Sequence, residues 1–383
     1  MVGAGKAAAA MAQVVDERWT GPLSGLVVTR YGHGLPCERV EVVEAGHPLP
    51  DTAGAEAAAR MLRLVGGLTA DDLVLALFSG GGSALITLPA PGLAISDLRQ
   101  VNGQLLKSGA AIGDINCVRK HLSAISGGRL GVACFPARVV TFLISDVPGN
   151  DPAVIASGPT VADPTTFAEA RAVAARYGLH FPAAVNHHLR QAVDETPKPG
   201  DHRLRRTQTI MLTTPDEALT AAASRAQAAG LGTITLGADL EGESRELAER
   251  HATMVREIQG RRPAGAPPTV LLSGGETTVT VRGAGRGGRN TEYLLALGLA
   301  LEAAAGAGVF ALAADTDGVD GTQECAGAFL GPDTMPRAAA AGLNPRSFLE
   351  ANDSHAFFRE LGDLVITGPT RTNVNDFRAV LIT

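Results

Sequence analysis

Two glycine-rich turns in the first hundred residues carry side chains that could bind an anion. In the opening stretch MVGAGKAAAAMAQ, Gly3 and Gly5 precede Lys6 and an alanine-rich run that predicts a helix. A helix N-terminus attracts phosphate because its N–H groups and its dipole both favour negative charge. The second turn follows the apolar run VLALF and consists of Ser79, Gly80, Gly81, Gly82 and Ser83. Three consecutive glycines allow a nest of N–H donors, so we expect a phosphate or carboxylate there; a plain tight turn is the alternative.

A third glycine-rich stretch, RGAGRGGRN, combines a nucleotide-like pattern with two arginines. Its glycines Gly283, Gly285 and Gly288 fit the dinucleotide fingerprint G-x-G-x-x-G. The opening stretch GAGKAA fits the related form G-x-G-x-x-A. The strand expected at 277–282 alternates threonine and valine, whereas the first strand of a dinucleotide-binding fold is buried on both faces. Arg286 and Arg289 suit a more anionic group, such as a triphosphate or a transferring phosphoryl. Asn290 is expected to cap the following helix.

Acidic side chains follow two of the expected strands. The stretch AADTDGVDG gathers Asp315, Asp317 and Asp320, and its hard oxygen ligands would suit Mg²⁺ alongside phosphate. An Asp-Gly-rich surface turn is the alternative. Asp146 ends another apolar run, where it could contact a metal or substrate, or simply cap a turn. Arg119 lies on an expected helix. It could bind substrate, or its positive charge could only stabilise the C-terminal end of that helix through the helix dipole. Cations, acids and glycine-rich loops together are the groups that phosphoryl transfer needs.

The elements that must position these residues indicate an α/β fold. Short, continuous apolar runs are typical of strands buried on both faces, as in parallel sheets. The expected strands are 25–30, 74–78, 138–145, 209–214, 233–237, 269–273, 277–282, 310–314, 363–367 and 379–383. Between them we expect helices at 4–18, 52–66, 96–111, 114–126, 167–177, 215–230, 243–260, 289–304 and 346–360. This alternation predicts mostly parallel or mixed sheets flanked by helices.

The length of the chain favours two domains. At 383 residues it exceeds the size at which a single core stops growing, roughly 250–300 residues. The stretch 193–208 is rich in proline and charge and poor in apolar residues, which is typical of a linker. We therefore divide the chain into domains at 1–200 and 201–383.

Composition excludes several classes of function. A net charge of −6 and only 4% aromatic residues argue against a nucleic-acid-binding surface. No run of about 18 apolar residues predicts a membrane span. The four cysteines are dispersed without zinc spacing, which favours reduced thiols and a cytoplasmic location. A homodimer is compatible with the sequence.

Long segments of the chain resemble those of the class II glycerate kinases, which are D-glycerate 2-kinases whose C-terminal half is the MOFRL domain. The matching segments are GAGKAAAAMA, SGGGSAL, INCVRKHLSAISGGRL, ISDVPGNDPAVIASGPTVADPTTF, LSGGETTVTVRGAGRGGRNTEYLLALGLAL, AADTDGVDG and ITGPTRTNVND. The resemblance implies a Rossmann-like N-terminal domain, a MOFRL C-terminal domain and an active site in the cleft between them. It also implies transfer of phosphate from ATP, with Mg²⁺, to the 2-hydroxyl of D-glycerate, giving 2-phosphoglycerate and ADP.

The same resemblance selects three catalytic residues, and we infer the individual roles from the chemistry of the side chains. Lys6, Arg289 and Asp315 match the family's proposed catalytic residues: the two cations would clamp the transferring phosphoryl, and the acid would hold the acceptor hydroxyl or its metal. The turn of residues 79–83 would bind the substrate carboxylate or a phosphate, together with Arg119 and Arg286. Asp317 and Glu276 are the candidate metal ligands.

Two alternatives stay open at this point. Family members usually carry an extra N-terminal helix and the whole first strand, so we expect the N-terminal domain to lack that helix and part of that strand. An inactive, shortened form that only binds ligand is therefore one alternative. The other is an NAD(P)H-dependent hydroxypyruvate reductase, which the two fingerprint matches favour.

Overall fold

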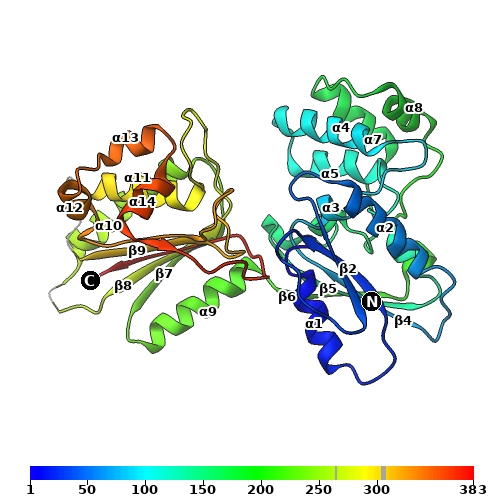
Figure 1. The fold of residues 1–383 in the computed structure, drawn as a ribbon, viewed down its shortest axis with the longest axis horizontal. Helices are drawn as coiled ribbons and strands as arrows, with labels where there is room; N and C mark the ends of the chain where they lie inside the picture. The colour runs from blue at the N-terminus through cyan, green and yellow to red at the C-terminus, as the bar shows by residue number, and fades with distance from the viewer. Residues whose placement is uncertain (264, 303–307) are drawn as a thin grey trace. The chain divides into compact units, whose positions relative to one another are not determined.

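The chain forms two units, one around each of two β-sheets. The computed structural model describes residues 1–263, 265–302 and 308–383. One unit comprises Met1–Leu212 and the other Thr213–Thr383, each with its own sheet flanked by helices (Figure 1). The division expected after residue 200 lies before β6 (Thr207–Thr213), which is a strand of the first sheet. The predicted two-domain α/β fold is confirmed.

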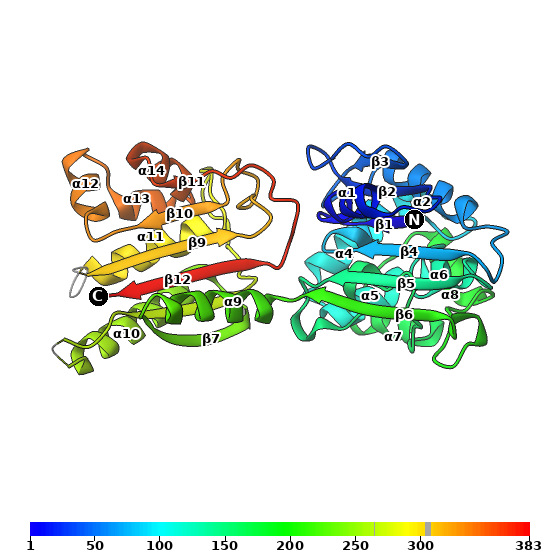
Figure 2. The ribbon, with the colours of Figure 1, turned by 90° about the horizontal axis from the view of Figure 1, so that it is seen from below.

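The first sheet has the strand order of a dinucleotide-binding Rossmann fold. Its six strands run in the order β3-β2-β1-β4-β5-β6 (Figure 2). Besides β6, they are β1 (Val2–Ala4), β2 (Gly25–Arg30), β3 (Val40–Ala45), β4 (Leu73–Phe78) and β5 (Arg138–Ile144). The three residues of β1 pair in parallel with β2 on one side and β4 on the other. The strand order reverses at β1 and β4, and ligands of open α/β sheets bind at such a point.

Helices cover both faces of this sheet. Helix α1 (Ala8–Arg18) packs Ala8 and Ala12 against one face, where Val27 and Leu77 lie. On the other face, α2 (Thr52–Leu64) contributes Met61 to a core with Phe78 and Val28, beside the short α3 (Gly82–Leu85) and α6 (Arg129–Ala133). A separate apolar cluster joins four helices, α4 (Ile95–Lys107), α5 (Ile112–His121), α7 (Phe167–Arg176) and α8 (Ala183–Gln191).

The second sheet is mixed, in the order β11-β10-β9-β12-β8-β7. Its strands are β7 (Gly232–Leu240), β8 (Thr269–Gly275), β9 (Val309–Asp315), β10 (Gly327–Leu330), β11 (Leu364–Val365) and β12 (Asp376–Ile382). β7 and β8 pair in parallel, while β12 runs antiparallel to both β8 and β9. Because β12 lies between β8 and β9, its first residue, Asp376, comes beside Gly275 and Asp315, where those strands end.

Helices again cover both faces. Helix α9 (Pro215–Ala228) packs Leu219 against one face. The opposite face buries the remaining helices, namely α10 (Ser244–Arg261), α11 (Arg289–Glu302), α12 (Thr334–Ala340), α13 (Pro345–Glu350) and α14 (Ser354–Leu361). None of the helices among the described residues is long and apolar enough to cross a membrane.

Two sequence predictions of elements are corrected by the structure. Residues 277–282 form no strand; Thr278 makes one isolated bridge, and the Thr277 hydroxyl bonds Ser244 Oγ at 2.8 Å. The alternation of threonine and valine thus reflects side-chain hydrogen bonds, not a pleated ladder. The helix expected at 346–360 is two helices, because Asn352 between them has a left-handed φ of 55°. Strands β3 and β10 were not predicted, and residues 303–304 of the helix expected at 289–304 lie outside the described residues.

Candidate active site

The turn that carries Lys6 lies beside the glycine-rich loop that follows β4. The Lys6 backbone N–H donates to the Gly80 carbonyl at 2.9 Å, which ties the ends of β1 and β4 together. The next residue of the loop, Gly81, has φ +83°, with the His47 ring beside it. Lys6 and this loop therefore meet where the strand order of the sheet reverses. The sequence predicted both as anion-binding groups, and the fold brings them together.

The place where a Rossmann fold normally admits a dinucleotide pyrophosphate is filled by protein. The second glycine of such a fingerprint lets the pyrophosphate approach the backbone. Here that glycine is Gly5, and a Cβ on it would lie 2.1 Å from Ser79 Oγ. The Ser79 side chain is fully buried, and its hydroxyl accepts from the Ala7 N–H at 3.0 Å, at the start of α1. Ser79, predicted to contact ligand, thus supports the Lys6 turn.

The other fingerprint match has no strand before it, since residues 277–282 are irregular. Its glycines allow close packing within the protein. A Cβ on Gly288 would lie 2.2 Å from the Asp320 carboxylate, and one on Gly283 would lie 2.2 Å from the Ala351 carbonyl. These positions face protein atoms, so the stretch is not a nucleotide-binding turn of the Rossmann type.

A cavity of about 360 Å³ opens beside the glycine-rich loop in the N-terminal unit. Of the predicted residues, Gly81, Ser83 and Arg119 line it, and Asp146 lines it from the end of β5. Further walls come from the segment after β3, from α3, α4 and α5, from residues 122–126 and from the segment 147–157. Arg119 donates from Nε to Asn102 Oδ1 at 2.8 Å, and burial lowers the pKa of its guanidinium. The cavity joins three of the segments that the sequence analysis selected separately.

The wall of this cavity includes a strained turn that sequence reasoning missed. Ala156 and Ser157 have left-handed φ values of 51° and 60°, which cost about 1–3 kcal/mol each for residues other than glycine. The turn places Ser157 Oγ 2.7 Å from Ser83 Oγ, and Ser157 donates to Asn116 Oδ1 at 3.2 Å. The motif VIASGPT contains this turn, but a serine between alanine and glycine gives no sequence signal of a left-handed pair.

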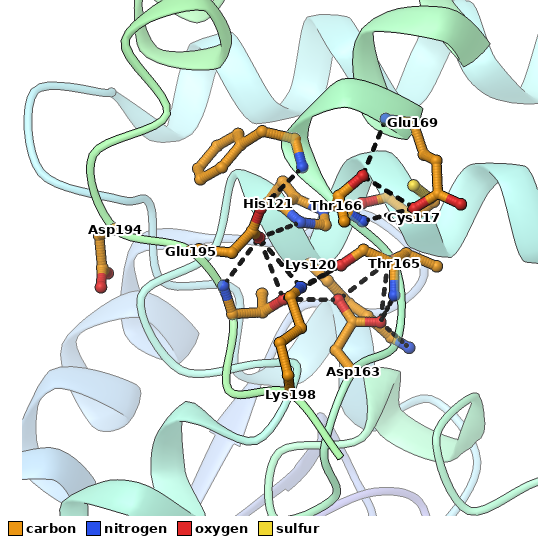
Figure 3. Close-up of polar contacts among 12 residues, drawn as sticks. Cys117, Lys120, His121, Asp163, Thr165, Thr166, Glu169, Asp194, Glu195 and Lys198 are labelled. Atoms are coloured by element: carbon orange, nitrogen blue, oxygen red, sulfur yellow. Dashed lines mark hydrogen bonds and ion pairs between the residues drawn. The ribbon is translucent and has the colours of Figure 1, made fainter. Parts of the chain in front are cut away.

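A polar network holds the C-terminal end of α5 (Figure 3). Lys120 pairs with the buried Asp163 at 3.4 Å, and His121 Nε2 lies 2.7 Å from Glu195 Oε1. Lys198 donates to the same Glu195 oxygen at 3.1 Å. Because Arg119 is on the same turn of α5, this network fixes the helix that carries the cavity's cation.

Within that network, the carboxyl pKa of Glu195 is shifted from its ordinary value. Partial burial raises the pKa of its carboxyl. Hydrogen bonds from the Phe167 N–H, Lys198, the Thr196 N–H and His121 outweigh this and lower the pKa to about 2. The ionised carboxylate is therefore the form that the folded protein favours.

In the C-terminal unit, Arg289 is the centre of a carboxylate cluster. Its Nε, Nη1 and Nη2 donate to Asp376, Glu276 and Asp315, each at 2.7 Å. Burial lowers the pKa of this guanidinium, but the three carboxylates outweigh burial and raise it above its ordinary value. The cluster gathers predicted residues from the end of β8, the start of α11 and the end of β9.

Asp376 is the member of this cluster that the sequence analysis missed. It also accepts from Asn290 Nδ2 at 2.8 Å and pairs with Arg378, whose side chain is fully buried. The sequence signal was present in the motif ITGPTRTNVND, whose last residue is Asp376. From sequence alone the motif is a polar loop, because no residue near it in the sequence indicates that β12 lies between β8 and β9.

The acids after β9 have separate roles. Asp320 caps α11, since its carboxylate accepts from the N–H groups of Asn290 at 3.0 Å and Thr291 at 2.9 Å. The prediction that Asn290 itself caps the helix is wrong. Burial raises the pKa of the Asp320 carboxyl. Asp317 is buried near Asp315, whose Oδ1 accepts the Asp317 N–H at 3.0 Å.

The predicted metal ligands do not form a ready-made cage. Among the described residues, no group of three or more His, Cys, Asp or Glu side chains is arranged to hold a metal ion. Mg²⁺, however, is typically held by one or two carboxylates together with substrate phosphates and water. The carboxylates of Glu276 and Asp317 fit that pattern. Arg286 is exposed, and its N–H donates to Asp353 at 2.8 Å.

Comparison with known proteins agrees with this two-unit architecture. Residues 1–190 match the family described as Domain of unknown function (DUF4147), and residues 269–376 match the MOFRL family. A protein from Thermotoga maritima named D-glycerate 2-kinase is 39% identical over 384 residues, covering 100% of this chain and 90% of that protein. The chain belongs to the glycerate 2-kinase family.

Other comparisons extend this result. The crystal structure of a glycerate kinase from Thermotoga maritima matches with a TM-score of 0.88 at 39% identity, covering 100% of this chain and 91% of that one. An Agrobacterium vitis protein that carries the provisional name hydroxypyruvate reductase is 51% identical over 385 residues, covering 100% of this chain and 86% of that protein. Names within the glycerate 2-kinase family thus divide between two activities.

Proposed function

We propose that this enzyme transfers a phosphoryl group from ATP to the 2-hydroxyl of D-glycerate, giving 2-phosphoglycerate and ADP. The observation that carries the proposal is full-length similarity to a protein named D-glycerate 2-kinase, at 39% identity. The cation and carboxylate groups described above supply what phosphoryl transfer needs: electrostatic clamps, a glycine-rich loop and acids that orient the acceptor.

In this proposal Lys6 and Arg289 stabilise charge on the transferring phosphoryl. Arg289 is suited to it because its guanidinium is held rigidly by the buried Asp376 and Asp315. Its third partner, Glu276, is 53% exposed at the side chain. A phosphoryl oxygen can therefore replace Glu276 on Nη1 while the other two contacts keep the guanidinium oriented.

Asp315 would accept a hydrogen bond from the acceptor hydroxyl, and so orient it for attack. Mg²⁺, held by Asp317 and by Glu276 once it leaves Arg289, would neutralise charge on the donor phosphates. Gly80–Ser83 and Arg119 would bind anionic groups of the substrates. Arg286, exposed on its loop, would add a further positive charge for an incoming phosphate.

A reductase is the second candidate, favoured by the name of the Agrobacterium vitis relative and by the Rossmann strand order. Two features of the structure oppose it. Ser79 fills the space at Gly5 that a dinucleotide pyrophosphate would need, and the second fingerprint lacks its strand. We therefore prefer the kinase.

The deciding experiment mixes the protein with D-glycerate, ATP and Mg²⁺ and follows ADP release. The phosphorylated product is identified by NMR, which distinguishes 2-phosphoglycerate from 3-phosphoglycerate. A parallel reaction supplies hydroxypyruvate with NADH or NADPH. ADP release with the 2-phosphate as product supports the proposal, whereas oxidation of either cofactor without ADP release in the first reaction would overturn it.

A further inference from the structure

The cavity of the N-terminal unit has two features that must both be explained by its ligand. One is an apolar wall that extends to an exposed rim: Leu49, Leu106 and Ile112 line the cavity while remaining 70%, 64% and 54% exposed. Deeper in the wall, Leu98, Val101 and Leu122 are buried. Large aliphatic side chains left exposed around a concave site mark a surface that a ligand covers.

The second feature is the Arg119 cation. It lines the cavity, and its Nε donates to the Asn102 amide oxygen at 2.8 Å; Asp146 lines the same cavity from the end of β5. A partly buried guanidinium bonded to a neutral amide oxygen gains further from a ligand that brings an anion. Because Arg119 occupies the amide oxygen of Asn102, the amide NH₂ of Asn102 remains as a donor.

D-glycerate accounts for only one of these features. Its carboxylate could pair with Arg119, but a three-carbon hydroxy acid has almost no apolar surface to cover the leucine and isoleucine rim. A nucleotide supplies both a flat heteroaromatic base and phosphates. The volume of about 360 Å³ lies within the ~300–1,000 Å³ typical of sites for larger organic ligands.

The position of the cavity fixes the direction in which such a ligand would lie. Gly81 and Ser83 line it on the side of the loop after β4, and the backbone of Lys6 is bonded to Gly80 of that loop. The apolar rim is formed by Leu49 from the segment after β3, Leu106 on α4 and Ile112 on α5, and contains none of these loop residues. A base against the rim would thus leave its phosphates near Arg119 and the loop.

We propose that this cavity binds the nucleoside of the phosphoryl donor, with the purine base against Leu98, Leu106 and Ile112 and a phosphate at Arg119. This rests on the proposed kinase function and assigns its donor to one place in the fold. Because the ordinary pyrophosphate site at Gly5 is closed by Ser79, the nucleotide occupies the Rossmann-like unit in a different way from a dinucleotide.

The test measures binding of ADP, adenosine and D-glycerate separately to the full-length protein by calorimetry. The variant L106A/I112A removes exposed apolar contacts without opening the core, and L64A on α2 is a matched control because Leu64 is exposed and does not line the cavity. The double variant loses two aliphatic contacts with the base, so it should weaken ADP and adenosine binding by about 10-fold or more. D-glycerate binding and the L64A variant should be unchanged.

A second variant, R119M, distinguishes the contribution of the phosphates to binding from that of the base. It should weaken ADP binding by about 10-fold or more while leaving adenosine binding within about 2-fold, because adenosine carries no phosphate. Loss of D-glycerate binding with ADP binding intact would overturn the assignment and make the cavity the acceptor site. ADP binding unchanged in both variants would also overturn it.

The wild-type protein distinguishes failure of this assignment from failure of the proposed function. If it releases ADP with D-glycerate and binds ADP, but the cavity variants bind ADP normally, only the assignment is wrong. If it neither phosphorylates D-glycerate nor binds ADP or adenosine, both are wrong.

Discussion

At the scale of single residues, the proposed phosphoryl transfer depends on side chains from separate loops. Lys6, Arg289 and Asp315 were selected by type, position and resemblance, and the structure shows what surrounds each. Arg289 lies among three carboxylates, a setting that no local pattern reveals because they come from separate strand ends. Ser79 and Asn290 have hydrogen-bonding side chains, as predicted, but Ser79 supports the Lys6 turn, and the helix that contains Asn290 is capped by Asp320.

Replacing Lys6 tests its proposed role in charge stabilisation. We expect K6A to lower kcat for ADP release by about 10²-fold or more, the usual effect of removing one electrostatic donor from a phosphoryl or oxyanion site. R18A, in the exposed last turn of the same α1, should leave kcat within about 2-fold. An unchanged kcat in K6A, with the fold intact by circular dichroism, would remove Lys6 from the mechanism.

Asp376 is expected to contribute strongly to stability because it counters two arginines. Its carboxylate pairs with Arg289 and with Arg378, and the Asp376 and Arg378 side chains are fully buried. D376N would remove the carboxylate that pairs with Arg378 and should lower the free energy of unfolding by about 3–5 kcal/mol. The matched variant D333N breaks the exposed pair with Arg337 and should cost less than about 1 kcal/mol. Urea unfolding measures both, and equal losses would contradict the difference in burial.

At the scale of elements, apolar runs predicted most strands within two residues, because burial on both faces leaves a clear signal. For example, β2 was predicted at its observed bounds, Gly25–Arg30. The strand expected at 277–282 is absent from the structure. Alternation of polar and apolar residues indicates a polar face, but it does not show whether a neighbouring strand is there to pair with. The left-handed turn at Ala156 and Ser157 could not be predicted, since tertiary hydrogen bonds to Ser83 and Asn116 hold it.

The network at the end of α5 should make stability depend on pH in the acid range. The pKa of Glu195 falls from 4.5 to about 2 on folding, so its carboxylate stabilises the folded state above about pH 4.5. That contribution is lost as the pH falls from about 4.5 toward 2. We expect wild type to exceed E195Q in the free energy of unfolding at pH 7, and the difference to shrink between pH 5 and pH 3.

Urea unfolding across that pH range provides the measurement. D194N is the neighbouring control, since Asp194 pairs with Arg129 through a side chain that is 74% exposed. It should change the free energy of unfolding by less than about 1 kcal/mol at pH 7. A difference between wild type and E195Q that stays constant from pH 7 to pH 3 would contradict the depressed pKa.

At the scale of the whole molecule, length and composition predicted two α/β units, and the family resemblance predicted a Rossmann-like unit followed by a MOFRL unit. The antiparallel partners of β12 could not be predicted, because pairing between residues distant in sequence leaves no local trace. This also explains why the site residue Asp376 was missed. Strand order, more than strand existence, determines which loops share a site.

The two sheets have separate apolar cores, and this should be visible in unfolding. Phe357 is fully buried in the core of the second sheet, while Phe167 is buried among α5, α7 and α8 of the first unit. Each replacement by alanine should cost about 3–5 kcal/mol and lower the Tm of its own unit by about 6–20 °C. We expect differential scanning calorimetry to resolve two transitions, with F357A lowering one and F167A the other. ADP should then raise the transition that F167A lowers, because the cavity proposed for the nucleotide lies in that unit. A single transition that moves as a whole in both variants would show instead that the two cores unfold as one cooperative system.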